Sequence, residues 1–140
     1  MPNDKQLVAD LRQGHLDLIE MLAYMESNIR SFPAIEPAIL KLQNQLLNHL
    51  KLQNDQLIED LSEYYGHDQE KKKMVEFFIF DTRELKIKVI TFVEKFVGTK
   101  SEALIHLFPK EGMELAKDIR LRLKLEEDYL FPLIENVKNI

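Results

Sequence analysis

The sequence predicts an all-α protein, folded as an antiparallel up-down-up-down bundle of four helices. Four long segments carry apolar residues at alternating spacings of three and four, which places those residues on one face of a helix. Short stretches with proline or glycine separate the segments, and such connections are typical of antiparallel neighbours in a helical bundle. No segment sustains the apolar–polar alternation of a strand, so we expect no sheet.

The first helical segment runs from about Asn3 to Arg30, and a break is expected at Ser31–Pro37. Pro37 suits the first turn of the next helix, because proline has no N–H to leave unsatisfied there. The second segment runs to about Tyr65, and the break at Gly66–Asp68 begins with a glycine that typically follows a helix. The two stripes are Leu7, Leu11, His15, Leu18, Leu22, Met25 and Ile29, then Ile39, Leu42, Leu46, His49, Gln53, Leu57, Asp60 and Tyr64.

The third segment covers about Asp68 to Val97, and Gly98 ends it. A short helical piece, Ser101 to Phe108, lies within the break at Gly98–Glu111, and the last long helix continues past Leu130. Pro132 should kink this helix or end its regular hydrogen bonding. The two stripes are Met74, Phe78, Asp81, Leu85, Phe92 and Phe96, then Leu115, Ile119, Arg122, Glu126, Leu130 and Leu133.

Size and charge restrict the classes of function. A chain of 140 residues is one domain, residues 1–140. Nineteen Lys and Arg against 24 Asp and Glu give a net charge of −5, which repels phosphate backbones, so we expect no nucleic-acid partner. The absence of cysteine excludes disulfides, thiolate metal sites and cysteine catalysis. Without the apolar core of a signal peptide or a run of roughly 20 apolar residues, we expect a cytoplasmic protein with no membrane contact.

All four stripes are interrupted by polar residues near their middle. Burying such groups costs several kcal/mol unless they pair with one another or bind something. A single polar residue on an apolar stripe is more often a core histidine with its hydrogen bonds made, or a residue at the edge of the buried face. Polar residues on the stripes of all four segments favour a common cluster in the core. The interrupting residues are His15, His49, Gln53, Asp81, Arg122 and Glu126, with Glu127 one position round the helix.

An internal repeat relates the second and last segments. His49–Leu57 and Arg122–Leu130 are identical at five positions, where Leu50, Lys51, Leu52, Asp55 and Leu57 match Leu123, Lys124, Leu125, Asp128 and Leu130. The alignment pairs His49 with Arg122 and Gln53 with Glu126. A pseudo-twofold arrangement of alternate helices would point these polar pairs at one central site.

The last segment resembles a known family. Arg122–Glu135, with Glu126-Glu127 followed by Leu130-Phe131-Pro132, resembles the last helix of hemerythrin-like, or HHE cation-binding, domains. His49–Leu57 is similar to the family's second-helix motif, and His15 falls where its first-helix histidine would be. The resemblance implies a four-helix bundle that holds two irons and binds or senses oxygen, stores iron or takes part in redox signalling. It also implies His15, His49 and Glu127 as ligand positions.

The departures from that family concern the ligands themselves. Gln53 stands where the family has a bridging glutamate, Arg122 stands where it has a histidine, and the third-helix histidines are absent. An amide brings no negative charge to a metal, and arginine stays protonated with no lone pair to donate. We therefore expect no cofactor and no catalysis: a non-enzymatic binding or signalling module with a degenerate metal site. Arg122 would replace the positive charge of the metal, with Asp81, Glu126 or Glu127 as its partner.

Two other functions stay open. One is a working oxygen or redox sensor that holds a di-iron centre or a single metal, with iron as its cofactor. The other follows from a similarity of Arg122–Leu130 to the last helix of the regulators of sigma D, four-helix proteins that bind a sigma factor domain. In the favoured function the partner is an unidentified protein, and the chain is a monomer or a homodimer.

The Arg122 side chain also has an alternative position. Its guanidinium could reach solvent at the edge of the bundle, so that only its aliphatic stem packs against the other helices.

Overall fold

The computed structural model describes residues 5–53 and 55–137, and within these ranges every regular element is a helix. The all-α class is therefore confirmed. None of the described helices is both long and apolar enough to cross a lipid bilayer. The elements are α1 (Lys5–Ser27), α2 (Glu36–Lys51), α3 (Asp55–Tyr64), α4 (Gln69–Phe96), α5 (Glu102–Leu125), the π-helix η1 (Glu126–Leu130) and α6 (Phe131–Glu135).

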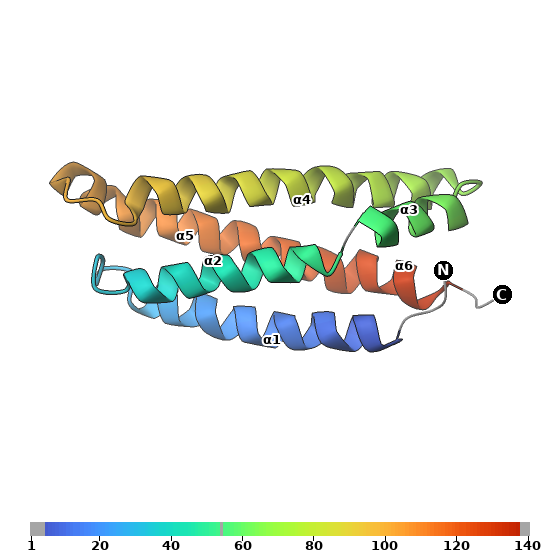
Figure 1. Ribbon diagram of the computed structural model, residues 1–140, viewed down its shortest axis with the longest axis horizontal. Helices are drawn as coiled ribbons and strands as arrows, with labels where there is room; N and C mark the ends of the chain where they lie inside the picture. The colour runs from blue at the N-terminus through green and yellow to red at the C-terminus, as the bar shows by residue number, and fades with distance from the viewer. Residues whose placement is uncertain (1–4, 54, 138–140) are drawn as a thin grey trace.

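Figure 1 shows α1, α2, α4 and α5 lying lengthwise beside one another. The chain reverses direction at the connections 28–35, 65–68 and 97–101. α1 packs against α2 and α5, and α4 packs against the same two helices. Beyond these four, α3 lies against α4, while η1 and α6 continue from α5 and contact α4 and α1 respectively.

The prediction of one continuous second helix up to about Tyr65 is wrong. α2 ends at Lys51, and α3 begins at Asp55; Asn54 lies outside the described residues. The N–H of Gln53 donates to the carbonyl of Leu50, which tightens the last turn. The Gln53 side chain is buried and bonds to α5 and η1, so a tertiary contact decides a local conformation that the stripe alone predicted as helical.

The predicted break at Gly98–Glu111 is too long, because α5 already begins at Glu102 and continues through Pro109. The packing of Phe108, the residue before Pro109, explains why the helix continues. The Phe108 ring is fully buried and stacks on Phe32 with ring centroids 4.3 Å apart, and it also contacts Phe92 and Phe96. This packing holds the helix in place where the missing N–H of proline weakens it.

The expectation for Pro132 is confirmed. Regular α-helical hydrogen bonding ends at Leu125, and the N–H of Phe131 donates to the carbonyl of Glu126, five residues earlier. Pro132 then occupies the first turn of α6. Its missing N–H removes the α-helical donor to the carbonyl of residue 128, which favours the wider turn.

The apolar core consists of two clusters. The larger one joins α1, α2, α4 and α5, and the smaller one joins the start of α1 to α3, the start of α4, and α6. On α4, Phe78 belongs to the smaller cluster and Leu85 to the larger one, with Asp81 between them. The polar residues that interrupt the stripes therefore lie at the boundary between the two apolar clusters.

Truncation of the Phe108 ring tests the packing that carries α5 through Pro109. Phe108→Ala is expected to lower the free energy of unfolding by about 3–5 kcal/mol, because it leaves a cavity among three other rings. Leu107→Ala, at an exposed neighbouring position, should change it by less than about 0.5 kcal/mol. Urea unfolding followed by circular dichroism measures both, and equal effects would contradict the assignment.

Candidate functional site

The carboxylate of Glu126 is the centre of a buried polar cluster. Its Oε1 atom lies 2.7 Å from Nε2 of His15 and 2.7 Å from Nε2 of His49. Its Oε2 atom accepts from Nε of Arg122 at 2.6 Å and from Nε2 of Gln53 at 3.0 Å. Glu126 is 0% exposed. Two oxygens with about four lone-pair positions thus receive four donors, so the acceptor capacity of this carboxylate is used.

Arg122 joins Glu126 to the other side of the cluster. Its Nη1 atom donates to Oδ2 of Asp81 at 2.8 Å, and its Nη2 atom donates to Oε1 of Gln53 and Oγ1 of Thr82, both at 2.8 Å. Its guanidinium carbon also lies 5.1 Å from the centre of the Phe78 ring, a favourable position for a cation. Arg122 is 1% exposed, so the alternative in which it reaches the edge of the helices is wrong.

The cluster reaches solvent at Glu127. This carboxylate lies 3.1 Å from Nδ1 of His15 and forms an ion pair with Arg12 at 3.5 Å, and its side chain is 42% exposed. Because an ionised carboxylate can only accept, both ring nitrogens of His15 donate when Glu126 and Glu127 are both charged. His15 thus links a buried carboxylate to a half-exposed one.

The pKa of Glu126 reflects two opposing effects. Burial raises the pKa, because it removes water from the charged form. The hydrogen bonds from His15 and His49, with the charges of His49 and Arg122, outweigh burial and hold the pKa well below its usual range. Glu126 is therefore ionised at neutral pH in the folded chain.

The structure brings together most of the residues selected from the sequence. Gln53, Asp81, Arg122 and Glu126 are linked by the hydrogen bonds described above, and His15 and His49 join them through Glu126. Glu127, a ligand position implied by the resemblance, lies at the rim, and the carboxylate shared by both histidines is Glu126 instead. The π-turn places the two neighbouring glutamates in these different environments.

Sequence reasoning missed Thr82 and Arg12. Thr82 follows Asp81 directly and is a polar residue beside the stripe, which was an available signal. Arg12 lies on the exposed side of α1, and no feature of the sequence connects it to Glu127.

Three residues of the cluster carry atoms that can ligate a metal. His15, His49 and Glu126 offer ligand atoms that lie within 4.8 Å of one another, and imidazole and carboxylate are ligands for iron and zinc. However, all acceptor positions of Glu126 are engaged, and the Arg122 cation lies against its Oε2 atom. On the α4 side, Asp81 is already paired with Arg122. These residues do not fit a di-iron centre.

Neither the protein-family models, nor the curated proteins, nor the solved structures compared with this chain match it. The geometry of the cluster therefore carries the functional argument.

Removal of the buried cation tests the cluster energetically. Arg122→Met should lower the free energy of unfolding by about 3–5 kcal/mol at neutral pH, because it leaves Glu126 buried without its cation. Adding Glu126→Gln to the same chain should recover part of that loss, and the double-mutant cycle gives the coupling between the two groups. Arg83→Met, on the exposed face of α4, is the control. A loss below about 0.5 kcal/mol for Arg122→Met would contradict a buried ion pair.

The lowered pKa of Glu126 predicts a pH dependence. A carboxyl group whose pKa is lower in the folded than in the unfolded chain stabilises the fold above its unfolded pKa, near 4.5, and loses this contribution as the pH falls. Between about pH 7 and about pH 3, this group should account for about 2 kcal/mol of lost stability. Urea unfolding at both ends of this range measures the free energy of unfolding, and the loss between them should be smaller by about 2 kcal/mol in Glu126→Gln than in the unmodified chain. Equal losses in the two chains would contradict the prediction.

Proposed function

We propose that this chain is a non-enzymatic binding or signalling module of hemerythrin-like, four-helix up-down architecture, in which an internal ion-pair network takes the place of the di-iron centre. The observation that carries the proposal is the saturated carboxylate of Glu126, with the Arg122 cation against it. The pair supplies, from within the chain, the positive charge that a metal would otherwise bring.

The network supports a structural role for the centre. Each of its principal groups is bonded to groups on other elements: His15 comes from α1, His49 from α2, Asp81 from α4 and Arg122 from α5. The Glu126 carboxylate at its centre is shielded from water and has all its acceptor positions engaged, so it has no free lone pair for a substrate. The centre therefore fits a part that sets the arrangement of the helices rather than one that performs chemistry.

A protein partner is supported by one face of α4. Phe77, Phe80 and Ile87 expose 43%, 63% and 60% of their surface, and their spacings of three and seven place them on neighbouring positions of one side of the helix. Exposed apolar groups that gather in this way are typical of interaction surfaces. If the partner is a sigma factor, as the similarity to the regulators of sigma D suggests, Phe80→Asp should abolish capture of a purified sigma factor, whereas Leu16→Asp on α1 should not.

A metal-dependent oxygen or redox sensor is the rival function, and the proximity of His15, His49 and Glu126 favours it. A metal would have to replace the two histidine hydrogen bonds to Oε1 of Glu126 and bind beside the Arg122 cation. The two functions therefore differ in the metal content of the purified protein and in the effect of restoring the missing ligands.

Metal analysis tests the proposal directly. The protein, purified without an affinity metal column, is expected to contain no stoichiometric iron and to lack the charge-transfer band of an oxo-bridged pair. The double variant Gln53→Glu with Arg122→His should bind Co²⁺ at least about tenfold more tightly than the unmodified chain, because it removes the cation and adds two ligands.

The matched control is Gln45→Glu with Arg83→His, which makes the same exchanges outside the cluster and should leave Co²⁺ affinity unchanged. A stoichiometric pair of irons in the unmodified protein, with the oxo-bridge band, would overturn the proposal and establish the rival.

A further inference from the structure

The outer side of α4 carries an ordered pattern of apolar and charged residues. Figure 1 shows this helix along one edge of the molecule, and α2, α3, α5 and η1 pack against its other sides. Phe80 lies in the middle of the outer side and is 63% exposed. Phe77 lies one turn before it and Ile87 two turns after it, both exposed. These three residues form the apolar centre of this surface.

Charged residues lie on both flanks of the apolar centre. Glu76 and Arg83 are seven residues apart, and Lys73 and Glu84 are eleven residues apart. Both spacings are close to a whole number of helical turns, so each pair shares one flank of the helix. All four side chains are exposed. Each flank therefore carries one positive and one negative charge.

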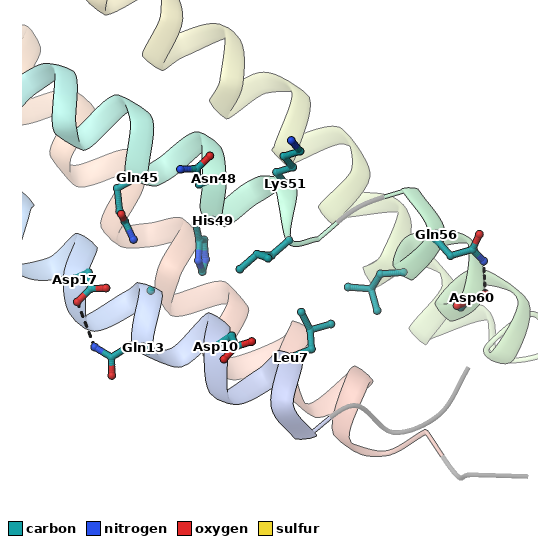
Figure 2. Close-up of a pocket in the computed structure, with 13 residues that line it drawn as sticks. Leu7, Asp10, Gln13, Asp17, Gln45, Asn48, His49, Lys51, Gln56 and Asp60 are labelled. Atoms are coloured by element: carbon teal, nitrogen blue, oxygen red, sulfur yellow. Dashed lines mark hydrogen bonds between the residues drawn. The ribbon is translucent and has the colours of Figure 1, made fainter.

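None of these four charged groups forms an ion pair within the described part of the chain. Charged groups elsewhere on the surface have partners. On the side of α4 next to α5, Lys88 pairs with Asp118 at 3.2 Å. Beside the groove between α1, α2 and α3, Asp17 and Asp60 each accept a hydrogen bond from the glutamine four residues before them (Figure 2). The four charges on the outer side of α4 are thus left for a group outside the described chain.

We propose that this side of α4 binds the same side of α4 in a second copy of the chain, as an antiparallel pair of helices about a twofold axis. The axis passes next to Phe80, between residues 79 and 80. Residues equally far before and after this point lie at the same height, and the axis brings the same flank of both helices together. Glu76 therefore lies opposite Arg83 of the partner subunit, and the twofold axis repeats this ion pair.

The other residues of the surface fit the same register. Lys73 and Glu84 of the partner subunit share the second flank with an offset of two residues, about 3 Å along the axis, which the flexible lysine side chain can span. The Phe80 rings of both copies meet beside the axis, and Phe77 lies next to Phe80 of the partner subunit. An apolar centre with a charged border is the usual composition of a protein interface.

The antiparallel direction follows from the residues in the middle of this side. Lys73, Phe80, Ile87 and Glu94 follow one another at intervals of seven residues. A parallel pair would place Lys73 against Lys73 and Glu94 against Glu94 of the partner subunit, and like charges in contact oppose association. The antiparallel pair avoids both contacts and sets the two helix dipoles in opposite directions.

This inference deepens the proposed function and rests on it for the interaction role of the α4 face, because it names a second copy of the chain as the partner there. One helix from each copy makes a small interface, so we expect a dissociation constant on the order of micromolar.

Sedimentation velocity of the full chain, over a series of concentrations, tests the proposal. The sedimentation coefficient should rise with concentration from that of a monomer to that of a dimer. Phe80→Asp should raise the dissociation constant at least about tenfold, because it buries a charge at the twofold axis. Leu16→Asp on α1 is the matched control, since Leu16 is 62% exposed, and it should leave the constant unchanged. A monomer at concentrations up to about 1 mM would overturn the proposal.

A charge exchange tests the register of the two helices. Glu76→Lys places like charges at both symmetric positions and should raise the dissociation constant about tenfold. Adding Arg83→Glu restores opposite charges and should return the constant to within about threefold of the unmodified chain. Glu114→Lys, at an exposed position of α5, changes the net charge equally and should have no effect. A double variant as weak as Glu76→Lys would overturn the pairing.

Disulfide formation tests the direction of the helices, because the chain has no cysteine of its own. A mixture of Glu76→Cys and Arg83→Cys chains should form a linked dimer under mild oxidation. Each variant alone should not, since its two cysteines would lie about 10 Å apart along the axis. Links from either variant alone, with none between the two variants, would overturn the antiparallel register.

Failure of this inference is distinguishable from failure of the proposed function. A chain that stays monomeric but captures a sigma factor through Phe80 would overturn only the inference. A dimer of the expected kind that contains stoichiometric iron would overturn only the proposed function.

Discussion

The buried carboxylate of Glu126 is the constraint on which the rest of the structure depends. A charge without water is tolerated only where donors and an opposite charge surround it. Here the donors come from α1, α2, the α2–α3 connection and α5. Each of these elements must therefore present one particular side chain at one particular depth. The single carboxylate fixes how far these helices can slide relative to one another.

This constraint accounts for two departures from regular helix. The chain leaves the helical path after Lys51, where Gln53 turns inward to bond both Glu126 and Arg122. It widens into a π-turn from Glu126 to Leu130, where one glutamate is buried and the next reaches the rim. Departures of this kind are frequent where a polar group must be positioned inside a protein. Both lie at the layer that separates the two apolar clusters.

The position of His49 depends on both η1 and α1. Its Nε2 atom belongs to the ion-pair network around Glu126, and its Nδ1 atom lies against Gly14, where a Cβ atom would be 2.8 Å away. Any side chain at position 14 would therefore push the imidazole ring away from its place in the network.

The sequence by itself determined the all-α class, the connections that follow α1 and α3, the end of regular helix before Pro132, and the polar residues that interrupt the stripes. These follow from local rules: apolar spacing, the missing N–H of proline, and the cost of a polar group on a buried face. Only the tertiary structure decided that α2 stops at Lys51, that α5 passes through Pro109, and that Glu126 rather than Glu127 is central. Each of these depends on a partner far away in the chain: Arg122 for Gln53, Phe32 for Phe108, and His15 with His49 for Glu126. Spacing along one helix identifies its buried face, but it does not identify which atom of another helix that face will meet.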